Sequence, residues 1–131
     1  MVLAVTKWCA NRQFSDLLGM RSALNELLSA VRSNVALNED RWYDLKIVLR
    51  ELCCNALEHG RSPVEVTVAN CGSGYLHVLV CDAGEGFDPC ALRYAHDQDA
   101  ERGRGLHIVD HLTESMAYNA AANKILVRMQ L

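Results

Sequence analysis

The sequence predicts a two-layer α/β sandwich, in which helices cover one face of a mixed, mostly antiparallel sheet. Two observations lead to this fold class. The first half of the chain contains two long stretches with apolar residues at spacings of three and four, the pattern of amphipathic helices. The second half contains short alternating or apolar stretches separated by turn residues, the pattern of strands. Helices and strands grouped in this way are typical of two packed layers.

The helices come first in the chain. Residues 2–6 are apolar enough for a short strand, and the pattern then becomes helical. We expect a helix over residues 15–36, with Ser15 as its N-cap. Asn38 caps a second helix, which Gly60 ends.

A hairpin follows the second helix. Residues 64–71 alternate between apolar and polar, as a half-buried strand does. Residues 75–82 are apolar enough for a central strand, and the stretch CGSG between the two is a turn. The two strands are therefore expected to pair.

The last third of the chain is less regular. Residues 83–104 show no period and contain Gly, Pro, Asp and Arg, so we expect a long loop. Residues 105–116 have a helical pattern, and residues 123–131 close the chain as a strand.

The composition is that of one globular domain, which we expect to span residues 1–131. Half of the residues are hydrophobic and 22% are charged, so the chain can bury a core without disulfides or metal. The formal net charge of −3 argues against nucleic acid as a partner. No stretch approaches the ~20 apolar residues of a membrane span, and we see no signal peptide. Six cysteines without a C-x-x-C pair indicate free, buried thiols in a reducing cytoplasm.

Four polar side chains share one side of the second predicted helix. With a turn of about 100° per residue, they fall within about 100° of one another around its axis. The four are Glu51, Asn55, Glu58 and His59. The apolar residues between them face the other way and would pack on the sheet. A solvated surface is the usual explanation of such a pattern, so this motif alone does not define a site.

Two glycine-containing motifs follow. Asp82 ends the predicted central strand and begins D-x-G-x-G-F-x-P, in which Gly84 and Gly86 allow close approach of a ligand to the backbone. Gly103 and Gly105 form a second G-x-G that leads directly into a helix, where backbone N–H groups can hold phosphate oxygens. Each G-x-G is weak by itself, because ordinary turns also contain glycine.

The ordered set is more specific. E-x-x-x-N-A-x-x-H, then D-x-G-x-G-F-x-P, then G-x-G-L-x-I-V resembles the GHKL ATP-binding module, which has a Bergerat-type sandwich fold. The resemblance covers the chain from about Asn38 to its end. The compact size and the helix over residues 15–36 look most like the bacterial anti-sigma-factor serine kinases. The resemblance implies ATP and Mg²⁺ as cofactors.

It also implies roles for individual residues. Asn55 would be the Mg²⁺ ligand from the protein, which suits a hard cation that keeps several waters. Glu51 would polarise the attacking serine hydroxyl or water. Asp82 would accept a hydrogen bond from the exocyclic amine of adenine, where guanine carries a carbonyl oxygen.

The glycines would line the nucleotide. Gly84 and Gly86 would pass beside the base and ribose. The phosphates would face Gly103, Gly105 and the backbone amide of Leu106. His59 matches the family motif, although a histidine at a helix end is often only a cap.

Residues 87–103 would form an ATP lid that closes over the site. An arginine in or beside it could neutralise charge during phosphoryl transfer, and a solvated surface is the alternative for each. The arginines are Arg93, Arg102 and Arg104. Many relatives carry a glycine-threonine pair before the last strand, where this chain has Asn123 and Lys124. That departure puts some phosphate contacts in question.

The resemblance implies a protein-serine kinase that transfers the γ-phosphate of ATP to a serine of a STAS-type antagonist protein and binds a sigma factor. It also suggests a homodimer. A binding module that clamps its partner in a nucleotide-dependent way, without phosphotransfer, is the alternative. A scaffold with an inactive site is a third class, and it would show no change in thermal stability with ATP and Mg²⁺.

Overall fold

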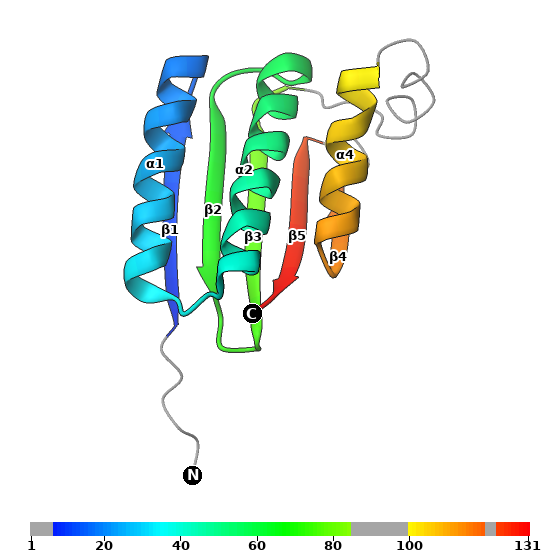
Figure 1. Cartoon of the computed structure of the whole chain (residues 1–131). Coiled ribbons are helices and arrows are strands. Elements are labelled where there is room, and N and C mark those ends of the chain that lie inside the picture. The colour runs from blue at the N-terminus through cyan, green and yellow to red at the C-terminus, as the bar shows by residue number, and fades with distance from the viewer. Residues whose placement is uncertain (1–6, 85–99, 120–122) are drawn as a thin grey trace.

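The computed structural model describes residues 7–84, 100–119 and 123–131, with the backbone alone for residues 100–105. Three helices lie on one face of a five-stranded sheet with the strand order β1-β2-β3-β5-β4 (Figure 1). Every pairing between these strands is antiparallel. The predicted two-layer α/β sandwich is confirmed.

The first strand and helix begin later than predicted. The predicted strand over residues 2–6 lies outside the described residues, and β1 runs over Trp8–Phe14. Helix α1 runs over Leu17–Asn34, and its N-cap is Asp16, not Ser15. The Asp16 carboxylate accepts a hydrogen bond from the Gly19 N–H at 2.7 Å. A carboxylate stabilises a helix start through both the cap bond and the helix dipole, which explains the preference.

Helix α2, Glu39–His59, has the predicted ends. The Asn38 side chain accepts a hydrogen bond from the Arg41 N–H at 2.8 Å, and the N–H of the C-cap Gly60 donates to Ala56 O at 2.9 Å. The apolar side of α2 packs on the sheet, with Leu45, Val48, Leu49 and Leu52 at most 1% exposed. The helix is therefore anchored along its length, which leaves its other side free for polar groups.

The predicted hairpin is also confirmed. Strands β2, Val64–Asn70, and β3, Tyr75–Asp82, pair in the register that sets Val66 opposite Val80. The turn between them contains Gly72 and Gly74 at φ of 80° and 86°, a region that non-glycine residues rarely adopt. The hairpin places Asp82 at the end of the central strand of the sheet.

The last helix differs from the prediction at both ends. Helix α4 runs over Ala100–Leu112, so residues 100–104 are helical although we predicted a loop. Ala, Glu and Arg around the glycines are good helix formers, and they extend the helix backward. At the other end, Ser115 and Met116 belong to β4, Ser115–Tyr118, because they pair with β5, Lys124–Gln130. Cross-strand pairing there overrides the helical pattern.

Five cysteines of the described residues are free. Cys53 is buried in the core, and burial raises the pKa of its thiol well above the usual range. Cys9 and Cys71 are exposed, so the expectation that all cysteines are buried was wrong for these two. Cys9 is at an exposed position of β1, where alternation exposes every second residue, and Cys71 lies in the turn after β2. Cys90 lies outside the described residues.

None of the helices in the part of the chain that the structure describes is long and apolar enough to cross a membrane.

Candidate functional site

The end of α2 lies directly against the end of β3. A Cβ atom added to Gly60 would come within 2.4 Å of both Cγ and Oδ2 of Asp82. Only glycine leaves room for the carboxylate at this position. The end of the first motif and the start of the second therefore meet in space, with Gly60, the residue after His59, beside the Asp82 side chain.

The Asp82 carboxylate is held by one of its two oxygens. Oδ1 accepts hydrogen bonds from the Gly84 N–H at 2.7 Å and from the Arg61 N–H at 3.3 Å. No hydrogen bond within the described residues uses Oδ2. A fixed carboxylate with one uncommitted oxygen is suited to accept a hydrogen bond from a ligand amine.

Asn55 is the one buried polar residue in the described part of the chain, at 4% exposure. Its Nδ2 has no hydrogen-bond partner there. A buried polar group without a partner costs about 1–3 kcal/mol, so such a group calls for an explanation. A bound ligand would supply one. Rotation of the carboxamide presents either its nitrogen or its oxygen, and an oxygen is the ligand that Mg²⁺ takes. The residue present thus fits the implied cation.

Glu51 lies half-buried one turn before Asn55. Burial, followed by the nearby Glu51 carboxylate, raises the pKa of the Cys54 thiol. Cys54 therefore stays protonated, and a protonated thiol is not the nucleophilic form. Further along, His59 Nε2 lies 3.6 Å from Glu58 Oε2, so these two polar residues of the motif contact each other.

The glycine-rich segments are described in part. A Cβ on Gly84 would come within 3.0 Å of Asp82 Oδ1 and of Arg61 Cβ, so this glycine is needed for close packing. Gly86 and Arg93 lie outside the described residues, as does the predicted lid up to residue 99. The remaining predicted positions belong to α4, which includes residues 102–104, predicted in a loop, as well as residues 105 and 106, predicted in the helix. They are Arg102, Gly103, Arg104, Gly105 and Leu106.

Helix α4 lies beside α2 on the same face of the sheet (Figure 1). Leu106 and Val109 anchor it there, at 1% and 0% exposure. The third motif is thus next to the first. The predicted contacts of Gly103, Gly105 and the Leu106 amide with phosphates stay predictions, because the N–H groups of a helix beyond its first turn normally bond within the helix.

Sequence analysis missed three residues of this site. Gly60 was interpreted only as a helix end, although it directly follows the histidine of the first motif. Arg61 contributes a backbone N–H to Asp82, which no side-chain pattern reveals. Asn123 was noted only as a departure from the family, yet its Nδ2 donates to Gly84 O at 2.8 Å.

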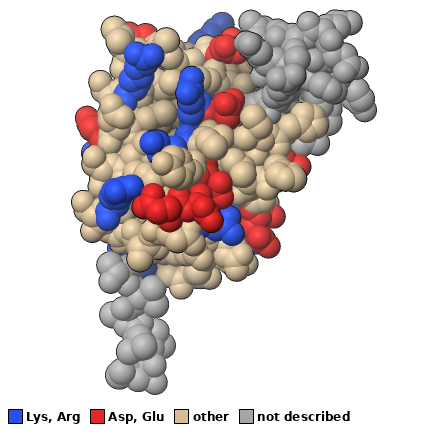
Figure 2. Space-filling model, viewed as in Figure 1, with Lys and Arg blue, Asp and Glu red and all other residues tan. Residues whose placement is uncertain are grey.

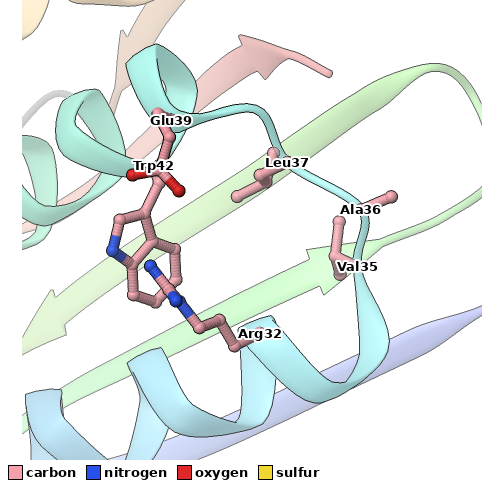
Figure 3. Close-up of a pocket in the computed structure, with 6 residues that line it drawn as sticks. All are labelled: Arg32, Val35, Ala36, Leu37, Glu39 and Trp42. Carbon is pink, nitrogen blue, oxygen red and sulfur yellow. The ribbon is translucent and has the colours of Figure 1, made fainter.

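A separate hollow lies at the other end of α2, where α1 connects to it (Figure 3). The Arg32 guanidinium lies 4.3 Å from the centre of the Trp42 ring and fills part of this hollow. Such a contact stabilises the helix connection by about 0.5–1 kcal/mol at an exposed position. The hollow is distinct from the Asn55–Asp82 site.

Fold and motifs together define a class of ATP-binding domain, and comparison with known proteins agrees. Residues 15–131 match the family described as histidine kinase-like ATPase domain, and the chain belongs to this family. It is similar to the serine-protein kinase RsbW of Bacillus velezensis, at 31% identity over 102 residues, and to that of Bacillus subtilis, at 29%. Each match covers 68% of this chain and 64% of the relative. The chain thus spans less than two thirds of the length of these curated relatives.

The Gly60 contact leads to a prediction. Gly60→Ala forces the Asp82 carboxylate aside, and we expect ATP affinity to fall about tenfold, equivalent to about 1.4 kcal/mol. Calorimetric titration with ATP and Mg²⁺ measures this. Gly74→Ala is the matched control, since Gly74 has positive φ but no atom within 4 Å of its added Cβ. It should lower the unfolding temperature and leave ATP affinity unchanged. Equal affinities for the two variants would contradict the prediction.

Proposed function

We propose that the protein is a protein-serine kinase that binds ATP and Mg²⁺ between α2, the end of β3 and α4. The observation that carries this proposal is the pair formed by the unpartnered, buried Asn55 amide and the half-committed Asp82 carboxylate. Asp82 lies against the C-cap of α2, the helix that carries Asn55, and family membership leads one to expect a nucleotide there. These relatives are named serine-protein kinases, which supports serine as the phosphate acceptor.

In this proposal each residue has one task. Asp82 Oδ2 accepts a hydrogen bond from the 6-amino group of adenine, and Asn55 holds the cation with its carboxamide oxygen. Mg²⁺, when bound, neutralises phosphate charge. Glu51 accepts the proton of the attacking serine hydroxyl, whose oxygen bonds to the γ-phosphorus as the bond to the ADP oxygen breaks. His59 and Arg104 remain supporting candidates at the edges of the site.

The acceptor is, in this proposal, a small STAS-type antagonist, and a sigma factor is the second partner. Phosphorylation adds about two negative charges to the antagonist and separates it from the kinase. The kinase thereby exchanges the antagonist for the sigma factor in response to nucleotide.

A groove between α1 and α2 is the surface we propose for a partner. Figure 2 shows several Lys and Arg side chains on the face that these helices form. Three cationic and several partly exposed apolar residues line the groove, and no acidic residue of the described chain does. They include Arg21, Lys46, Arg50, Leu17, Tyr43 and Ile47. This combination fits an amphipathic, acidic helix of the partner.

The groove is tested by Ile47→Asp, which places a negative charge on the 39% exposed Ile47 in its apolar part. We expect at least tenfold weaker binding of a candidate antagonist or sigma factor, with ATP affinity unchanged. Ile108→Asp is the control, because Ile108 is equally exposed at 37% but lies on α4, away from the groove. A dimer that dissociates in Ile47→Asp alone would assign the groove to a second copy of this chain and refute the acidic-helix proposal.

Incubation with γ-labelled ATP, Mg²⁺ and a candidate antagonist tests the kinase function itself. Label on a serine of the antagonist supports transfer. ATP that stays bound and intact supports the second candidate, a nucleotide-dependent clamp. That candidate is favoured by one feature, the replacement of the glycine-threonine pair of many relatives by Asn123 and Lys124.

A further inference from the structure

The turn that precedes β5 lies next to the Asp82 carboxylate. In the pairing of β3 with β5, Cys81 is opposite Lys124. The ladder continues by one residue, because the Asp82 N–H donates to Asn123 O at 2.9 Å. Asn123 is therefore the direct cross-strand neighbour of the residue proposed to recognise adenine.

The Asn123 side chain reaches over the same turn. Its Nδ2 donates to Gly84 O at 2.8 Å, and the Gly84 N–H donates to Asp82 Oδ1 at 2.7 Å. Asn123 thus holds Gly84 at its carbonyl oxygen, and the N–H group of the same residue orients the Asp82 carboxylate. Through these two bonds, the position of Asp82 Oδ2 depends on the amide of Asn123.

Asn123 is itself clamped by Asn119, the residue that follows β4. Asn119 Oδ1 accepts hydrogen bonds from the N–H groups of Asn123 at 3.0 Å and Lys124 at 3.2 Å. Asn119 Nδ2 donates to Asn123 Oδ1. Because the oxygen of the Asn123 amide is taken by Asn119, its nitrogen is the end that faces Gly84. Such connected networks fix side chains more firmly than isolated bonds do.

We infer that Asn123 is a positioning residue for base recognition. It holds the Gly84 turn so that Asp82 Oδ2 faces the 6-position of a purine, and it thereby produces a preference for 6-amino over 6-oxo purine nucleotides. This inference rests on the proposed ATP-binding function. It assigns a specific task to a position at which the chain departs from the glycine-threonine pair of many relatives.

Asn123→Asp tests the inference with almost no change in shape. The variant keeps the oxygen that Asn119 bonds, but it loses the donor to Gly84 O and sets a carboxylate oxygen against that carbonyl. ATP and ITP differ at the 6-position, so we measure the dissociation constants of both by calorimetry with Mg²⁺ on the full chain. We expect ATP affinity to fall about tenfold and ITP affinity to change less than about twofold, as loss of one oriented charge-assisted bond predicts.

Two further measurements separate positioning from general loss of structure. Amide hydrogen exchange of Gly84 in the nucleotide-free protein should be about tenfold faster in Asn123→Asp, because its turn is released. Asn70→Asp is the control: Asn70 Oδ1 accepts from Gly72 N–H at 3.0 Å in the β2–β3 turn, at the other end of the sheet, and keeps this acceptor as Asp. It adds the same charge and should leave both affinities and Gly84 exchange unchanged.

The outcomes are distinct. A wild-type ATP preference that persists in Asn123→Asp, or unchanged Gly84 exchange, overturns the inference and leaves the ATP-binding function intact. Wild-type protein that binds neither nucleotide overturns the proposed function, and the inference with it. If Asn123→Asp does not fold, Asn119→Ala replaces it, since loss of the clamp should lower the ATP-to-ITP preference about threefold. An unchanged preference in that variant also overturns the inference.

Discussion

Glu51→Gln should reduce phosphate transfer to the antagonist by about 10²–10⁴-fold, the range that a general base contributes. Gln has the same shape but cannot accept a proton from the serine hydroxyl. ATP affinity should stay within about twofold of the wild type, because Glu51 acts on the nucleophile and not on the nucleotide. Single-turnover transfer of label from γ-labelled ATP measures the first quantity, and calorimetry measures the second.

The matched control for Glu51 is Glu58→Gln on the same helix. Glu58 is exposed and lies beside His59, so its loss should change transfer by less than about threefold. Transfer that persists at the wild-type rate in Glu51→Gln would show that the proton goes elsewhere. An equal loss in both variants would show that charge on α2, not a specific base, is what matters.

Asp82→Asn should weaken ATP binding by about 10–100-fold, because a hydrogen bond to a charged group contributes about 1.5–3 kcal/mol. The preference for the base should change as well. An amide offers a donor toward the 6-carbonyl of ITP, whereas the carboxylate repels that oxygen. We therefore expect ATP affinity to fall and ITP affinity to rise, so that the ratio of the two falls further than the loss of ATP affinity alone would cause. Calorimetric titration with each nucleotide measures this.

Asp44→Asn is the control for this change. Asp44 lies on α2 at 3.4 Å from the Arg41 guanidinium, with its side chain 23% exposed, and the variant removes one negative charge without touching the site. Its nucleotide affinities should equal those of the wild type. If Asp82→Asn binds ATP and ITP as the wild type does, adenine is recognised by other groups and the assignment of Asp82 is wrong.

The parts of the fold that the sequence predicts well have local signals. Helix α2 was predicted from Asn38 to Gly60 because its cap residues and its apolar spacing lie within the helix itself. The β2–β3 hairpin was predicted because alternation and the glycine turn are also local. The same two elements carry Asn55 and Asp82, so the most informative site residues could be named before their contacts were known.

The remaining features depend on residues far apart in the chain. Gly60 touches Asp82, and Asn123 bonds to Gly84 across 39 positions, and no periodicity records such contacts. The start of α4 was misplaced because residues 83–104 contain Gly, Pro, Asp and Arg without a period, while the helix formers near residue 103 and the packing of Leu106 favour a helix. The N-cap was predicted one residue early, at Ser15, because Ser and Asp both cap helices and local sequence does not separate two adjacent candidates.

Titration of the wild-type protein with ATP and Mg²⁺, alongside Asn55→Leu, tests the central claim most directly. The account predicts saturable binding at one site per chain to the wild type, and at least tenfold weaker binding to the variant. It also predicts that Asn55→Leu without nucleotide is no less stable than the wild type, since it removes a buried amide nitrogen that has no partner in the described chain. A well-folded wild type that takes up neither ATP nor ADP would contradict the account.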